Sequence, residues 1–145
     1  MIPSFNSRRL CNHILVRTAS ARVLVVEDER HIARYLEFVL RKEGYEVGIA
    51  HDGEDALRRI QASCPDALLL DLVLPGMSGL ELLSAIRADR QYDGLVIIVL
   101  SARTSSEDTE LLASANVQAQ CPKPVAPSTL IKKLTEFGIR PARQS

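Results

Sequence analysis

Three carboxylates, a hydroxyl and a lysine each follow an apolar run of this 145-residue chain. They are Glu27 and Asp28 after VLVV, Asp71 after ALLL, Ser101 after VIIVL, and Lys123 after a weaker fifth segment. Carboxylates about 4 Å apart repel by roughly 4 kcal/mol per pair at an effective dielectric constant near 20, so a crowded group takes up a proton or binds a cation. Oxygen ligands without a nearby His or Cys favour Mg²⁺, Mn²⁺ or Ca²⁺ over zinc. The set therefore suits a divalent cation together with a phosphate, with Asp71 as the best-placed nucleophile.

These side chains act together only if the fold brings the ends of the apolar runs to one place. Such runs are typical of strands buried on both faces, and the helical stretches between them indicate a parallel α/β sheet. All strand carboxyl ends then lie on one edge, where open α/β sheets bind ligands. We therefore expect an α/β fold: a doubly wound, five-stranded parallel sheet of order 2-1-3-4-5, flavodoxin-like, with five helices on its two faces. Pro122 agrees with this order, because it has no N–H for a sheet ladder and the fifth strand lies at an edge.

Capping residues mark the ends of the expected helices. The first helix is expected over 31–43 and ends at Gly44, and the second is capped by Asp52 and runs to about residue 63. Capping boxes begin the third helix, at Ser78 and Glu81, and the fourth, at Thr104 and Glu107, which ends near Asn116. The fifth helix has Pro127 in its first turn. A short strand is expected over 46–50. The alternation of strand and helix supports the expected fold.

Four sequence segments together resemble the receiver domain of two-component response regulators, of the chemotaxis-regulator type. The segments are VLVVEDE with Glu27 and Asp28, LLLDLVLPGMSG with Asp71, VLSA with Ser101, and KP with Lys123. The resemblance runs from about residue 22 to about residue 137, and the combination of four motifs at matching spacing makes it specific. It implies that Asp71 accepts a phosphoryl group from a phosphohistidine of a histidine kinase or phosphotransfer protein. The domain would then be a signalling domain that phosphorylates and dephosphorylates itself, not a turnover enzyme.

The same resemblance implies a role for each remaining site residue. Mg²⁺, with Mn²⁺ as a substitute, would be held by Asp28, Asp71 and the backbone carbonyl of Val73, and Glu27 would take part through a water molecule. Ser101 and Lys123 would bind phosphoryl oxygens. A downstream protein target would meet the face made by the fourth helix, the fifth strand and the fifth helix.

Three positions depart from the usual receiver pattern or tune it. Gln120 stands where receivers commonly have Tyr or Phe, so the usual route from the site to the output face is in question. Val73 and Arg103 occupy the two positions that tune attack by water in the family. Val73 has no group to orient a water, and Arg103 either pairs with phosphate or obstructs it. We therefore hypothesise slow autodephosphorylation, which a phosphoryl lifetime of seconds would rule out.

Other function classes stay open beside this interpretation. A receiver that binds its partner without phosphorylation is conceivable because of Gln120. An aspartyl phosphohydrolase of the haloacid dehalogenase type is disfavoured, because Val73 stands where that family has a second aspartate. A flavodoxin-like binder of nucleotide or flavin needs a Gly-rich or hydroxyl-rich loop after the first strand, whereas Glu27 and Asp28 repel phosphate unless a metal intervenes.

Length and charge set the expected domain organisation. We expect a basic, mobile N-terminal extension over 1–20, a receiver domain over 21–138 and a short C-terminal tail over 139–145. Zero formal net charge argues against direct binding of nucleic acid. No apolar run suits a membrane span or a secretory signal, so we expect a cytoplasmic protein, as a monomer or weak dimer. Whether the chain acts alone or is part of a larger regulator stays open. His13, His31 and His51 lack ligand spacing and are expected at the surface.

Overall fold

The computed structural model describes residues 20–101, 110 and 112–142, and it contains a five-stranded parallel sheet of order β2-β1-β3-β4-β5. The strands are β1 (Arg22–Val26), β2 (Glu46–Ala50), β3 (Ala67–Asp71), β4 (Val96–Ser101) and β5 (Ala119–Pro122). Every neighbouring pair is parallel. The expected strand order is confirmed, and β5, which ends in a proline, lies at an edge.

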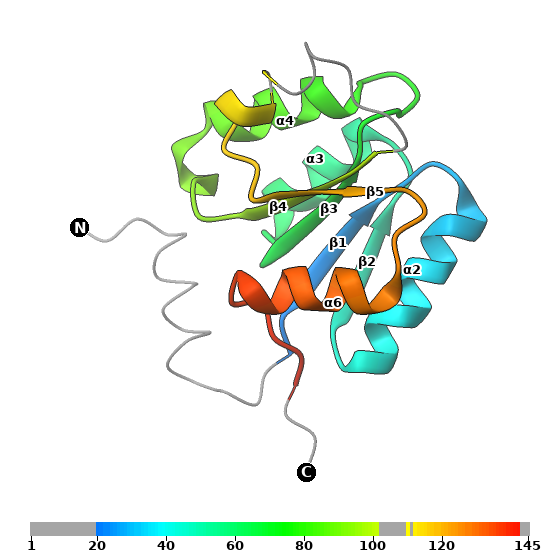
Figure 1. The fold of residues 1–145 in the computed structure, drawn as a ribbon. Coiled ribbons are helices and arrows are strands. Elements are labelled where there is room, and N and C mark those ends of the chain that lie inside the picture. The colour runs from blue at the N-terminus through cyan, green and yellow to red at the C-terminus, as the bar shows by residue number, and fades with distance from the viewer. Residues whose placement is uncertain (1–19, 102–109, 111, 143–145) are drawn as a thin grey trace.

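Helices cover both faces of the sheet (Figure 1). One face carries α2 (Arg30–Glu43) and α6 (Pro127–Glu136), and the other carries α3 (Gly53–Ala62) and α4 (Gly79–Ala88). A 3₁₀ turn, Arg90–Tyr92, follows α4. Residues 110 and 112–114 are helical and belong to the fourth expected helix, whose capping box at Thr104 and Glu107 lies outside the described residues. None of the described helices is long and apolar enough to span a membrane.

The central strands β1, β3 and β4 are buried on both sides, as their apolar runs predicted, whereas the edge strands β2 and β5 are partly exposed. Successive side chains of a strand point to opposite faces, so each central strand contributes to two separate cores. The core under α3 and α4 contains Leu24, Val26, Leu68 and Leu70, and the core under α2 and α6 contains Val23, Val25, Ala67 and Leu69. Because helices cover both faces of the sheet, the polar side chains at the carboxyl ends of the strands are the ones left accessible to a ligand.

The helix ends follow the capping residues of the sequence. Gly44 has the left-handed conformation at the end of α2, with φ 106°. Asp52 accepts the N–H of Asp55 at 2.7 Å, and Ser78 forms the expected capping box with Glu81. Asn116 also has positive φ, at 56°. The helix α2 begins at Arg30, one residue before the expected start.

The segment after α6 packs against the body of the domain as far as residue 142. Ile139 is buried, and its carbonyl accepts the hydroxyl hydrogen of Tyr45 at 2.7 Å. The N–H of Ala142 donates to the carbonyl of Gly44 at 3.2 Å. The first residues of the expected C-terminal tail are therefore tied to the end of α2 and the start of β2, while 1–19 and 143–145 lie outside the described residues.

Candidate metal centre

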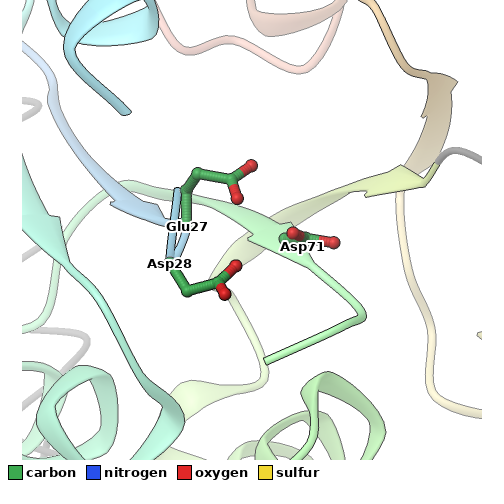
Figure 2. A group of neighbouring side chains, drawn as sticks. All are labelled: Glu27, Asp28 and Asp71. Carbon is green, nitrogen blue, oxygen red and sulfur yellow. The ribbon is translucent and has the colours of Figure 1, made fainter. Parts of the chain in front are cut away.

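Three carboxylates converge at the carboxyl edge of the sheet (Figure 2). Glu27 and Asp28 follow β1 directly, and Asp71 is the last residue of β3. The strands β1 and β3 are neighbours, with Val26 opposite Leu70. The residues that follow these two, Glu27 and Asp71, therefore lie side by side. One carboxylate oxygen from each of the three acids lies within 4.8 Å of the others. The expected meeting of residues 27, 28 and 71 is therefore observed.

Lys123 bridges two of these carboxylates. Its Nζ lies 2.7 Å from Oε1 of Glu27 and 3.0 Å from Oδ2 of Asp71. The β4 and β5 ladder places it there, because Ser101 pairs with Pro122 and the N–H of Lys123 donates to the carbonyl of Ser101 at 3.1 Å. The lysine side chain is only 18% exposed, so both ion pairs are shielded from water.

Burial changes the acidity of this group. Burial raises the pKa of Glu27 and a nearby Asp71 raises it further, whereas Lys123 and the N–H of Glu29 oppose the shift without cancelling it. Burial also lowers the pKa of Lys123, but its contacts with Glu27 and Asp71 outweigh this effect and raise the pKa overall. The lysine thus stays protonated, and one lysine does not neutralise the carboxylates around it.

A divalent cation fits this charge balance. Oε1 of Glu27 is buried and, apart from its ion pair with Lys123, has no hydrogen-bond donor among the described residues. Three carboxylates against one ammonium leave a surplus of negative charge that a cation would remove. Asp28 is exposed, so water has access to the cluster. Oxygen ligands with room for water suit Mg²⁺. Glu27, Asp28 and Asp71 thus form a group of carboxylates that could hold a metal ion.

The backbone around Asp71 is held tightly. Its Oδ1 accepts the N–H of Val73 at 3.1 Å, and its Oδ2 faces Lys123. Gly79, the first residue of α4, donates its N–H to the carbonyl of Leu72 at 3.0 Å. A Cβ on Gly79 would lie 2.6 Å from both the carbonyl oxygen of Asp71 and the Cα of Leu72, so a side chain would force this backbone to move. The close approach of α4 thus supports the position of Asp71.

The other expected site residues occupy different surroundings. Ser101 ends β4 at the same edge of the sheet and is buried. The side chain of Val73 is 78% exposed, and Gln120 lies exposed on β5. Arg103 lies outside the described residues. The structure therefore gathers Glu27, Asp28, Asp71, Ser101 and Lys123 at one edge.

The structure adds one residue that the sequence analysis placed at the surface. His51 is half-buried, and its Nδ1 lies 3.0 Å from the backbone carbonyl oxygen of Glu27. The sequence analysis did not predict this contact, because metal-ligand spacing says nothing about a hydrogen bond to a backbone atom on the neighbouring strand. The available signal was its place just after β2, at the same edge as the acidic pair. His31 is exposed as expected, and His13 lies outside the described residues.

Comparisons with known proteins agree on one family. The response regulator receiver domain model matches residues 23–135. The DNA-binding response regulator MtrA of Mycolicibacterium smegmatis is 36% identical over 117 residues, which are 81% of this chain and 50% of that protein. MtrA of Mycobacterium leprae is 36% identical over 113 residues, which are 78% of this chain and 49% of that protein. The chain thus spans about half the length of these curated relatives.

Solved structures of similar chains extend the likeness to the fold. The chemotaxis protein CheY4 of Vibrio cholerae superposes with a TM-score of 0.77 at 34% identity, over 82% of this chain and 99% of that one. A CheY-like receiver domain protein of Methanospirillum hungatei superposes with a TM-score of 0.77 at 32% identity, over 81% of this chain and 93% of that one. Both likenesses cover most of the described sheet and its helices.

Proposed function

The chain belongs to the receiver-domain family of two-component response regulators. We propose that Asp71 is its phosphoacceptor. Receiver domains are signalling domains. We propose that the product of the reaction is the phosphorylated domain itself and that the domain is not a turnover enzyme. The observation that carries the proposal is the position of Asp71, buried at the carboxyl edge of the sheet and 3.0 Å from the ammonium of Lys123. A buried carboxylate beside a cation is a ready acceptor for an anionic group.

The proposed reaction transfers a phosphoryl group from a phosphohistidine to a carboxylate. A bond forms from phosphorus to an Asp71 carboxylate oxygen, the bond from phosphorus to the donor imidazole nitrogen breaks, and the imidazole leaves with the bonding electron pair. Lys123 would shift its contact from the carboxylate toward a phosphoryl oxygen, and the Ser101 hydroxyl would donate to another. These two residues would stabilise negative charge that Asp71 cannot carry alone.

A cation in the cluster would be Mg²⁺, with Mn²⁺ able to substitute. Asp28, Asp71 and the backbone carbonyl of Val73 would hold it, and Glu27 would act through a water molecule. When bound, it supplies positive charge between the carboxylates and the incoming phosphoryl group. The buried Oε1 of Glu27 and the surplus of negative charge support this assignment.

We further propose partners for this domain. The donor is a histidine kinase or phosphotransfer protein, and a downstream protein target binds the face made by the fourth expected helix, β5 and α6. Gln120 lies exposed on β5, within that face. Slow autodephosphorylation, a cytoplasmic location, the monomeric or weakly dimeric state and the lack of direct nucleic-acid binding stay predictions.

Intact-protein mass spectrometry tests the acceptor directly. The protein is incubated with a small-molecule phosphodonor, with and without Mg²⁺, beside Asp71→Asn and the control Asp93→Asn, whose carboxylate is exposed after α4. We expect a Mg²⁺-dependent gain of one phosphoryl group in the wild type and the control, and none in Asp71→Asn. A wild type that gains no mass under any condition would reject the proposal and favour a receiver that binds its partner without phosphorylation.

A further inference from the structure

We propose that His51 is a positioning residue for the cation site, because it holds the peptide that joins Glu27 to Asp28. Nδ1 of His51 lies 3.0 Å from the backbone carbonyl oxygen of Glu27. A carbonyl oxygen only accepts hydrogen bonds, so Nδ1 carries the hydrogen and donates it. His51 does not touch the cation position itself. It acts through the backbone of the acidic pair.

Asp28 is the carboxylate that needs this support. Glu27 and Asp71 are each paired with Lys123, and each also accepts a backbone N–H. Asp28 is exposed, and within the described part of the chain its carboxylate has no hydrogen bond or ion pair to hold it. The direction of its side chain is therefore set by its backbone. That backbone begins at the peptide whose oxygen His51 binds.

The end of β2 contacts the backbone of Glu27 through the peptides on both sides of this residue. The β1 and β2 ladder ends with Val26 opposite Ala50, and the N–H of Glu27 still donates to the carbonyl of Ala50 at 3.0 Å. The carbonyl of Glu27 is the next acceptor along the strand, and the imidazole of His51 supplies its donor. The side chain of His51 thus adds one hydrogen bond to the ladder between β1 and β2, at the point where β1 ends and the loop with Asp28 begins.

This inference rests on the proposed function, because it concerns cation binding by the same carboxylates. Losing one neutral hydrogen bond that orients a ligand from outside the coordination sphere should weaken Mg²⁺ binding by about three- to tenfold. The fold itself should persist, because His51 is half-buried and lies at the end of a strand.

Two variants of nearly equal shape isolate the donor. Asn places its Nδ2 at the same number of bonds from Cα as Nδ1 of His, so His51→Asn keeps a donor, whereas His51→Leu has a similar shape and no donor. We expect His51→Leu to bind Mg²⁺ about three- to tenfold more weakly than the wild type and His51→Asn to recover to within about twofold. His51→Ala replaces His51→Leu should the latter not fold. His31→Ala is the control, because that imidazole is 83% exposed on α2.

The measurement is a Mg²⁺ titration followed by NMR shifts of the Asp28 and Val73 amides, near pH 8 where a free imidazole is neutral. Urea unfolding in EDTA runs beside it. A merely structural role would lower the stability of His51→Leu and leave its Mg²⁺ affinity at the wild-type value, which would overturn the inference alone. A wild type that does not bind Mg²⁺ would overturn both this inference and the proposed function.

Discussion

The bridge from Lys123 to two buried carboxylates makes this lysine a sensitive point for stability. At an effective dielectric constant near 20, each contact, of 2.7 Å to Glu27 and 3.0 Å to Asp71, contributes an attraction of about 6 kcal/mol before desolvation is subtracted. Burying the three groups offsets most of that attraction. Removing only the lysine leaves the desolvation cost of the two acids in place and leaves their mutual repulsion without compensation. We therefore expect Lys123→Met to lose about 3 kcal/mol of unfolding free energy in EDTA, the low end for a broken buried pair because 18% of the lysine is exposed.

Mg²⁺ should compensate for the lost lysine. The variant site carries one more unbalanced negative charge, so a divalent cation binds it more tightly than the wild-type site. A ligand that binds only the folded state stabilises it by about 2.7 kcal/mol at a hundredfold excess over Kd. The stabilisation by a fixed concentration of Mg²⁺ should thus be at least about 1 kcal/mol larger in Lys123→Met than in the wild type.

Urea unfolding followed by circular dichroism measures both quantities. Each protein is unfolded in EDTA and in Mg²⁺, with Lys133→Met as the control, because Lys133 forms a partly exposed ion pair with Glu136 at 3.6 Å. Adding Glu27→Gln to Lys123→Met should restore part of the lost stability, because it removes one of the two facing charges. A loss below about 1 kcal/mol in EDTA, or equal stabilisation of both proteins by Mg²⁺, would refute this account of the charge balance.

Three further expectations concern the support of the site. Gly79→Ala should cost about 1–3 kcal/mol of unfolding free energy and slow phosphorylation, because the new Cβ meets the backbone of Asp71 and Leu72. In the control Gly48→Ala the Cβ would meet only a side-chain atom at 3.5 Å, so the stability and the phosphorylation rate should stay unchanged. Arg87→Met should lower the urea midpoint, because the guanidinium of Arg87 donates to four backbone carbonyls at 2.8–3.0 Å. The control Arg90→Met changes an exposed side chain and should leave the midpoint unchanged. Equal midpoints for the two variants would contradict the role of Arg87. The pKa of Glu27 lies above its ordinary value, so in the acid range its carboxyl keeps a proton that a cation must displace. The Mg²⁺ affinity, measured by titration at several pH values, should therefore fall as the pH drops through that pKa, and an affinity independent of pH would exclude Glu27 from the site.

The local structure and the meeting of the carboxylates, the hydroxyl and the lysine at one edge were predictable from the sequence. Apolar runs of four or five residues indicated strands buried on both faces, and the carboxylates and hydroxyl that end them had to meet at one edge of a parallel sheet. The caps at Gly44, Asp52 and Ser78 likewise follow from short-range chemistry. A helix cap depends on residues within a few positions of one another, so it can be predicted from a short stretch of sequence.

The connections between distant segments were decided only by the tertiary structure. Lys123 reaches Glu27 because three strand pairings, β1 with β3, β3 with β4 and β4 with β5, set its distance. His51 meets the same residue because β2 ends beside β1. Arg87 ties the end of α4 to carbonyls 28 and 29 residues further on, which its place in an amphipathic helix does not reveal.

The physical reason is the difference between periodicity and register. Hydrophobic patterns determine which face of an element is buried, and therefore the layers of the fold. Contacts of 3 Å between side chains on different elements depend on strand register, on the close approach of α4 that Gly79 permits, and on which buried charges remain unbalanced. The pattern of residues along the chain therefore brings these groups to the carboxyl edge of the sheet, and the packing of the elements sets which of them touch.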